Sequence, residues 1–168
     1  MPHDPPTIYT IGHSTHPIGD FLDLLKAHGI ESLVDVRSFP ASRRHPQFNK
    51  EALAESCRGA GLAYYHMVSL GGRRKAQDVP VHDTKWRNPS FANYADYATT
   101  PPFRAALAEL EAIGRNSRAA IMCAEALWWQ CHRQIIAEEL VKDGFEVTHI
   151  VPKAQARAAE RSPMLPGL

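Results

Sequence analysis

Short β-rich segments alternate with amphipathic helical segments along almost the whole chain. The β-rich segments lie at residues 8–11, 32–37, 62–67, 119–122 and 146–151. After the first of them, apolar residues recur at helical spacing at Ile18, Phe21, Leu22 and Leu25. Strand–helix–strand units are right-handed in nearly all cases, which makes parallel pairing the expected arrangement. The alternation therefore predicts an α/β fold: one three-layer, Rossmann-like domain with a mostly parallel sheet of about five strands flanked by helices.

One domain accounts for residues 1–168. Further helices are expected at residues 49–58, 91–98, from 101 onward and 130–142. A polar loop is expected from about Leu70 to Pro89. The core is expected at about residues 8–151, with residues 152–168 as a tail. Neither an internal repeat nor a second domain is indicated.

The composition favours a cytoplasmic protein without membrane contact. The formal net charge is +1, so no global field favours nucleic acid or a membrane surface. No apolar run approaches the ~20 residues of a membrane-spanning helix, and the first residues do not resemble a signal peptide. The three cysteines form no CxxC pair, and their odd number suits a reducing compartment. The composition does not indicate an oligomeric state.

Polar residues cluster where the expected strands end. They are Gly12, His13 and Ser14 after the first strand, Asp35 and Arg37 on the second, His66 on the third, and Cys123 and Glu125 on the fourth. Ligands of open α/β sheets bind beyond the carboxyl ends of the strands, near the point where the strand order reverses. We therefore expect a pocket at this edge, with Gly12, His13 and Ser14 as its floor.

The stretch from Ile121 to Arg133 holds the densest group of reactive side chains. It contains Cys123, Glu125, Cys131, His132 and Arg133. A thiol is mostly protonated at neutral pH, with a reference pKa of about 8.5. A nearby cation or helix N-terminus stabilises the nucleophilic thiolate. Cys123 is therefore a candidate nucleophile, Cys131 a candidate resolving thiol, and Glu125 or His132 a candidate general acid or base. The alternative interpretations are that Cys123 is a buried structural cysteine and that His132 is a hydrogen-bonded histidine of the core.

Several familiar sites are excluded by spacing. A C-x5-R phosphatase loop fails because residue 129 is Trp, and neither a GxGxxG motif, a Walker P-loop nor a GxSxG elbow is present. Consecutive helical residues diverge by ~100°, so Cys131 and His132 are not expected to share a metal ion. We expect neither a metal nor another cofactor.

Basic residues in two loops suggest an anionic ligand. If Arg37, Arg43 and Arg133 converge, they form a multidentate clamp for phosphate or carboxylate. Asp35 is then better suited to orient an arginine than to act as a base. Solvated surface charge is the alternative reading of these clusters.

The chain resembles the family of domains of unknown function numbered 488. The resemblance rests on Thr10–Ser14, Asp35–Arg43, Tyr65–His66, Leu70–Gly72, Phe91 with Tyr94, Cys123–Glu125 and Cys131–Arg133, and it runs from about Ile8 to Val151. This family implies one α/β domain with a polar site and no settled activity. On the matching residues we place Gly71 and Gly72 among the substrate-binding positions, with Gly12, Ser14, Arg37, Arg43, His66 and Arg133. The candidate catalytic residues are Cys123, Glu125, His132, Asp35 and His13.

Three functions are compatible with this pattern. The first is an enzyme acting on an anionic, phosphate-bearing substrate such as a nucleotide or a nucleic-acid fragment. The second is a non-catalytic module that binds nucleic acid or a small anion. The third is a redox sensor in which Cys123 and Cys131 form a disulfide.

Overall fold

The computed structural model of the protein describes residues 4–74 and 86–151. The predicted tail and most of the predicted loop after Gly72 lie outside these ranges. Five parallel strands form one sheet in the order β3-β2-β4-β1-β5. They are β1 (Thr7–Gly12), β2 (Ser32–Asp35), β3 (Ala63–His66), β4 (Ala119–Cys123) and β5 (Glu146–Ile150).

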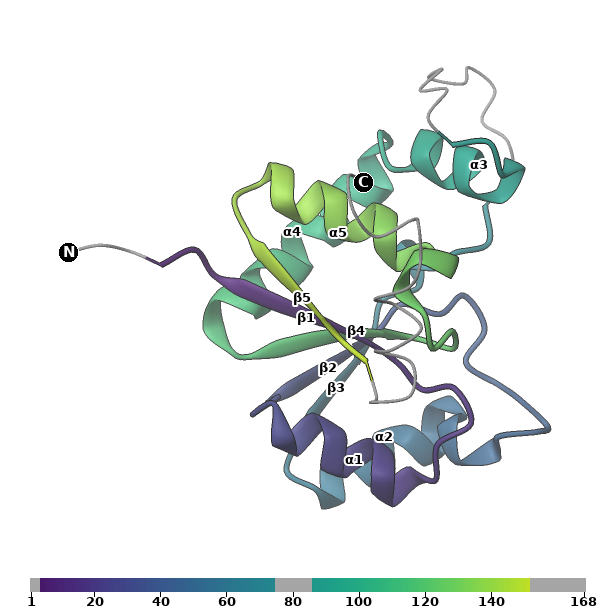
Figure 1. Cartoon of the computed structure of the whole chain (residues 1–168), viewed down its shortest axis with the longest axis vertical. Coiled ribbons are helices and arrows are strands. Elements are labelled where there is room, and N and C mark those ends of the chain that lie inside the picture. The colour runs from purple at the N-terminus through teal and green to yellow at the C-terminus, as the bar shows by residue number, and fades with distance from the viewer. Residues whose placement is uncertain (1–3, 75–85, 152–168) are drawn as a thin grey trace.

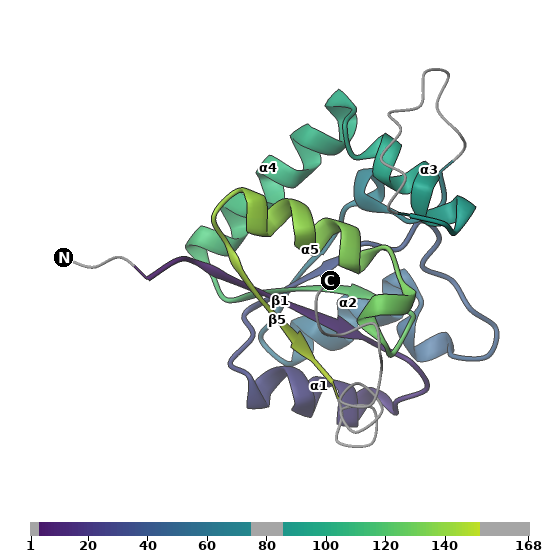
Figure 2. The ribbon, with the colours of Figure 1, turned by 45° about the horizontal axis from the view of Figure 1, so that its top comes forward.

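Helices cover both faces of the sheet. On one face lie α1 (Ile18–Ala27) and α2 (Lys50–Gly59), and on the other lie α3 (Pro89–Tyr97), α4 (Pro101–Asn116) and α5 (Arg133–Lys142). Figure 1 shows α1 and α2 below the sheet and α4 and α5 above it, and Figure 2 shows the three helices of the second face side by side. The apolar side chains accordingly form two buried clusters. The predicted three-layer α/β fold is confirmed.

The strand order reverses at β4. Chain leaving β1 and β2 passes to the face of α1 and α2, whereas chain leaving β4 passes to the face of α5. β4 lies between β1 and β2 in the sheet. The chain that leaves β4 therefore runs to the opposite face from the chains that leave both of its neighbours. A crevice at the carboxyl end of β4 follows from this topology.

Two elements differ from the prediction. The second strand ends at Asp35 rather than Arg37, because the Arg37 side chain folds back onto Asp35. The helix expected from residue 130 begins at Arg133, since Trp128–Gln130 forms a separate 3-10 turn and Cys131 is extended. Because of this break, Cys131 and His132 are not consecutive residues of one helix, as the prediction assumed. None of the helices in residues 4–74 and 86–151 is long and apolar enough to span a bilayer.

A buried carboxyl makes the fold sensitive to pH. Burial, a hydrogen bond shared with Asp143 and the charge of Asp143 raise the pKa of Glu111 on α4 from 4.5 to about 7, against the opposing charges of Arg115 and Arg104. The folded state therefore binds this proton more tightly than the unfolded chain. This contribution to stability is complete below about pH 4.5 and is lost as the pH rises through about 7.

We predict that the Glu111→Gln variant flattens this dependence. Between about pH 5 and pH 8 the wild-type protein should lose on the order of 2 kcal/mol of unfolding free energy that the variant keeps. Urea denaturation at both pH values measures the difference. Glu109→Gln, at an exposed position of the same helix, is the matched control. Parallel profiles for Glu111→Gln and wild type would contradict the assignment.

Candidate functional site

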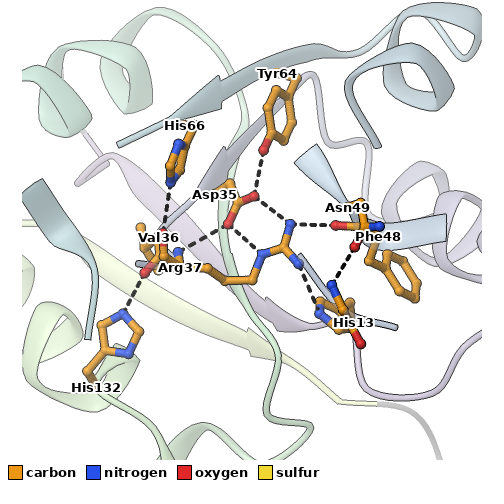
Figure 3. A network of polar contacts seen from close by, with 10 residues as sticks. His13, Asp35, Val36, Arg37, Phe48, Asn49, Tyr64, His66 and His132 are labelled. Atoms are coloured by element: carbon orange, nitrogen blue, oxygen red, sulfur yellow. Dashed lines mark hydrogen bonds and ion pairs between the residues drawn. The ribbon is translucent and has the colours of Figure 1, made fainter. Parts of the chain in front are cut away.

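A buried ion pair lies at the end of β2. Arg37 donates from Nε to Asp35 Oδ1 at 2.9 Å and from Nη2 to Asp35 Oδ2 at 2.7 Å, with both side chains almost fully buried. The Arg37 backbone N–H also donates to Asp35 Oδ1 at 3.1 Å. Figure 3 shows this fork-to-fork pairing at the centre of the polar network. As the sequence suggested, Asp35 orients an arginine.

Other elements contribute partners to this pair. Tyr64 of β3 donates its hydroxyl hydrogen to Asp35, and Arg37 Nη2 donates to the Phe48 carbonyl at 2.6 Å. Arg37 Nη1 lies 3.3 Å from His13 Nε2, and the His13 ring stacks on Phe48. Burial, with a smaller effect of Arg37, lowers the pKa of His13 to about 4, so this ring is neutral and can accept from Arg37. All three side-chain nitrogens of Arg37 are therefore engaged within the protein.

Two histidines hold the chain that follows β2. His66 Nε2 lies 2.8 Å from the Arg37 carbonyl oxygen, and His132 Nε2 lies 2.8 Å from the Val36 carbonyl oxygen. Figure 3 shows the two rings approaching this segment from different sides. A carbonyl oxygen only accepts hydrogen bonds, so Nε2 carries the hydrogen in both rings. The Nδ1 atom of His132 is left as an acceptor.

A pocket opens beside this network at the end of β4. We call it the thiol pocket, and its volume is about 310 Å³. It is lined by Arg37, Ser38, Phe39, Gly72, Arg73, Ser90, Phe91, Cys123, Ala124, Glu125, Gln130, Cys131 and His132. Its position agrees with the crevice that the strand order produces.

Two cysteines lie together in the wall of the thiol pocket. Cys123 and Cys131 are 3% and 5% exposed, and their sulfur atoms are 2.6 Å apart. Burial, together with the hydrogen bond to Cys131, raises the pKa of Cys123 well above its ordinary value. Burial alone would also raise the pKa of Cys131, but the Cys123 hydrogen bond and Arg133 lower it to about 7. Its neighbours thus favour the ionised form of Cys131, whereas burial disfavours that of Cys123.

An imidazole lies next to the more acidic thiol. Cys131 Sγ is 3.4 Å from His132 Nδ1, the nitrogen that the Val36 contact leaves as an acceptor. Burial lowers the pKa of His132, which keeps the ring neutral. Adjacent residues can meet here because Cys131 is extended whereas His132 has helical dihedrals. The Cys131 thiol, the neutral His132 imidazole and the Val36 carbonyl thus form a row in space, each within hydrogen-bond reach of the next.

A guanidinium group lies beneath the dithiol without a carboxylate partner. Arg133 is 1% exposed, and within residues 4–74 and 86–151 no carboxylate forms an ion pair with it. It donates from Nη1 to Thr10 Oγ1 at 3.2 Å and from Nη2 to the Glu125 carbonyl at 2.6 Å, while Nε has no hydrogen-bond partner in the part of the chain that the structure describes. Its backbone N–H donates to Cys131 Sγ at 3.4 Å. Arg133 therefore acts on the pocket through its charge.

Three glycines permit close packing around the pocket. A Cβ atom on Gly12 would overlap the Glu125 carbonyl, and one on Gly71 would overlap Ser38. A Cβ atom on Gly72 would lie 2.6 Å from His132 Nδ1. Gly72 thus allows the imidazole to take its position beside Cys131. The two other glycines allow the loops after β4 and β2 to pack closely against their neighbours.

The structure gathers only part of the predicted set. Cys123, Glu125, Cys131, His132, Arg37 and Gly72 line the thiol pocket. The remaining predicted residues do not line it: Gly12, His13, Ser14, Asp35, Arg43, His66, Gly71 and Arg133. Arg43 is exposed, and Arg37 and Arg133 are both buried, so the three arginines form no common clamp.

Other lining residues were not predicted as site residues. They are Ser38, Phe39, Arg73, Ser90, Phe91, Ala124 and Gln130. Ser38 directly follows Arg37, and Arg73 directly follows Gly72. Their positions next to predicted site residues could have indicated that they line the pocket. Ser90 and Gln130 lie in a capped helix start and a 3-10 turn, where no pattern marked them. Among the described residues no group of three or more His, Cys, Asp or Glu side chains could hold a metal ion.

Fold and site together define a doubly wound α/β domain with a thiol–imidazole pocket at its strand reversal. The family model described as "Domain of unknown function DUF488" matches residues 17–140, most of the chain, and the protein belongs to this family. The matched range stops short of β1 and β5. No curated protein and no solved structure matches the chain.

We predict that Arg37→Ala destabilises the protein strongly. The substitution leaves the Asp35 carboxylate buried without its guanidinium, and breaking a buried pair costs about 3–5 kcal/mol. Chemical denaturation followed by circular dichroism measures this loss. Arg43→Ala, at an exposed position of the same loop, should change stability by less than about 0.5 kcal/mol. Equal effects of the two substitutions would show that the ion pair does not organise the site.

Proposed function

We propose that this protein is a thiol enzyme in which Cys131 is the nucleophile and a small anionic molecule is the substrate. The observation that carries the proposal is the alignment of Cys131 Sγ, His132 Nδ1 and the Val36 carbonyl. Nucleophile, base and orienting group within hydrogen-bond reach form the general arrangement of covalent catalysis. The geometry favours Cys131 over Cys123 as the nucleophile.

The reaction follows from the hydrogen-bond directions. His132 Nδ1 takes the thiol proton as the Cys131 sulfur forms a bond to the electrophilic atom of the substrate. The bond to the leaving group breaks with its electron pair, and the leaving group receives the proton from His132. Water then attacks the covalent adduct, His132 takes a proton from this water, and the thiol is restored.

Two neighbours support the reactive form of Cys131. The buried charge of Arg133 and the hydrogen bond from Cys123 both stabilise a thiolate. A helix also begins at Arg133, directly after the thiol and the imidazole. Helix N-termini and cations are the usual means by which proteins lower a thiol pKa.

The anionic substrate class rests on the rim of the thiol pocket. Arg73 is exposed there and has no carboxylate ion pair among the described residues. The hydroxyl groups of Ser38 and Ser90 lie on the same lining. The charge of Arg37 is matched by Asp35 and therefore adds little. A phosphate or carboxylate at Arg73 fits a pocket of about 310 Å³.

We predict that iodoacetamide modifies Cys131 far faster than Cys57. The pKa of Cys131 is about 7, whereas burial raises the pKa of Cys57 to about 11. The rate of Cys131 alkylation should be half-maximal near pH 7 and rise with pH. Peptide mass mapping of the timed reaction gives both rates in one sample.

Substitution at Arg133 separates charge from packing. Arg133→Met keeps much of the side-chain volume, and it should move the midpoint of Cys131 alkylation upward by at least one pH unit. His132→Gln should lower the maximal rate of adduct formation with an activated ester such as p-nitrophenyl acetate. A Cys131 that is no more reactive than Cys57 at pH 7 would sink the proposal.

The distance between the sulfur atoms favours a second candidate, a redox-sensing dithiol. At 2.6 Å the Cys123 and Cys131 sulfurs need little movement to form a disulfide. With hydrogen peroxide as oxidant, the Cys131 thiolate takes one peroxide oxygen as a sulfenic acid, and the other leaves as hydroxide, which takes up a proton from solvent to give water. Cys123 then attacks this sulfur, the disulfide forms and a second water leaves.

We predict that mild peroxide treatment removes two hydrogens from the intact mass of the wild-type chain. Dithiothreitol should restore the mass, and Cys123→Ser should abolish the reversible change. Cys57→Ser, at a buried cysteine on the other face of the sheet, is the matched control. Three free thiols throughout the titration would rule out the sensor.

A further inference from the structure

All three tryptophans of the chain line one further cavity. Its volume is about 800 Å³, and it lies between the start of α3, the 3-10 turn after β4, α5 and β5. We call it the tryptophan cavity. Its lining residues are Trp86, Arg87, Asn88, Phe91, Trp128, Trp129, Gln134, Ala137, Glu138, Val141, Lys142, Val147 and His149. A cavity of this size and of mostly apolar lining is typical of small-molecule sites.

Its aromatic walls suit a flat ring. The indoles of Trp128 and Trp129 have centroids 5.5 Å apart and meet at 87°. A planar ligand can therefore stack on the face of one indole and contact the edge of the other. Phe91, with Trp86 edge-on to it at 5.9 Å, adds a further aromatic surface.

One side chain supplies a directed polar group. His149 stacks on Trp128 with the centroids 4.1 Å apart, and its Nδ1 lies 2.6 Å from Thr10 Oγ1. Thr10 Oγ1 accepts from Arg133, and with its own hydrogen it can donate to His149 Nδ1. Burial, with the charge of Arg133, lowers the pKa of His149 to about 3, and the ring is neutral. With Thr10 as the donor to Nδ1, the neutral His149 carries its hydrogen on Nε2, on the opposite side from Thr10.

The two cavities share their walls. Phe91 lines both, and the segment 124–132 supplies Cys131 and Gln130 to the thiol pocket and Trp128 and Trp129 to the tryptophan cavity. Arg133 is hydrogen-bonded to Thr10 on one side and to Cys131 on the other. The tryptophan cavity and the thiol pocket are thus neighbours, with Phe91 and the segment 124–132 common to their walls.

We propose that the tryptophan cavity binds a heteroaromatic ring of nucleobase type, and that the anionic group attached to this ring reaches the thiol pocket. The ring site itself stands on the stacking surfaces and on the His149 N–H, which can donate to a ring nitrogen or carbonyl. The link to the thiol pocket rests on the proposed function. The substrate class is then a nucleotide-like molecule with a stacking base and a phosphate or carboxylate.

Intrinsic fluorescence of the full chain tests the ring site, because all tryptophans line this cavity. Titration with the four ribonucleoside 5′-monophosphates should give saturable quenching with at least one of them. The matching nucleoside should bind more weakly, and inorganic phosphate alone should leave the spectrum unchanged. Indole that binds as tightly as the best nucleotide, or the absence of saturable binding by any nucleotide, would overturn the inference.

Variants locate the binding in the cavity. Trp128→Leu should weaken the binding of the best nucleotide about 5- to 100-fold, as expected for the loss of one base-stacking contact. His149→Phe keeps an aromatic ring stacked on Trp128 and removes the N–H donor of His149. It should weaken the binding of the same nucleotide about 5-fold or more. Calorimetry measures both variants, because the first loses part of the fluorescence signal. Tyr65→Leu, at an exposed tyrosine that lines neither cavity, should bind as the wild type does.

The thiol measurement keeps the two proposals apart. Cys131→Ser should still bind the nucleotide, and saturating nucleotide should slow alkylation of Cys131 in the wild-type protein. Binding to a protein whose Cys131 is unreactive would remove the thiol enzyme and retain the ring site. A reactive Cys131 in a protein that binds no nucleotide would remove the ring site and retain the thiol enzyme. Binding that leaves the alkylation rate unchanged would overturn the link between the cavities.

Discussion

The buried pair of Asp35 and Arg37 is the constraint on which the rest of the site depends. Two charges removed from water need close partners, and here those partners come from separate parts of the chain. Tyr64 arrives from β3, the Phe48 carbonyl from the segment before α2, and His13 from the end of β1. Such a pair adds little net stability compared with an apolar core. Its physical effect is to fix how the strand ends and their loops meet.

The position of the Val36 carbonyl is the consequence that matters for chemistry. Val36 lies between the two members of the ion pair, and its N–H donates to the Met122 carbonyl of β4 at 2.9 Å. Its own carbonyl then meets His132 and determines which imidazole nitrogen carries the hydrogen. The ionic network therefore reaches the thiol through one peptide group. Under the proposed function, this connection is the route by which Arg37, whose side-chain nitrogens are all engaged within the protein, influences the thiol.

Much of the architecture could be predicted from the sequence. Alternating apolar periods located the five strands and placed Cys123 and Glu125 at one edge with Arg37, because parallel strands all end on the same side. The contacts that decide the chemistry could not be predicted this way. The pairing of Cys131 with His132 depends on a change of backbone conformation between neighbours, and periodicity assumed one continuous helix. The expected clamp of Arg37, Arg43 and Arg133 assumed free guanidinium groups, whereas burial engages two of them within the protein.

The remaining question is how the fold accommodates the deeply buried guanidinium of Arg133, which has no carboxylate partner within residues 4–74 and 86–151. Desolvation of an isolated charge is costly, and hydrogen bonds to Thr10 and the Glu125 carbonyl offset only part of that cost. Under the proposed function, an ionised Cys131 supplies a negative charge. The coupling is reciprocal: the cation lowers the pKa of the thiol, and the thiolate in turn stabilises the buried cation. Thr10 also joins Arg133 to His149 through two hydrogen bonds. Arg133 lines neither cavity, but this network connects its charge to Cys131 of the thiol pocket and to His149 of the tryptophan cavity.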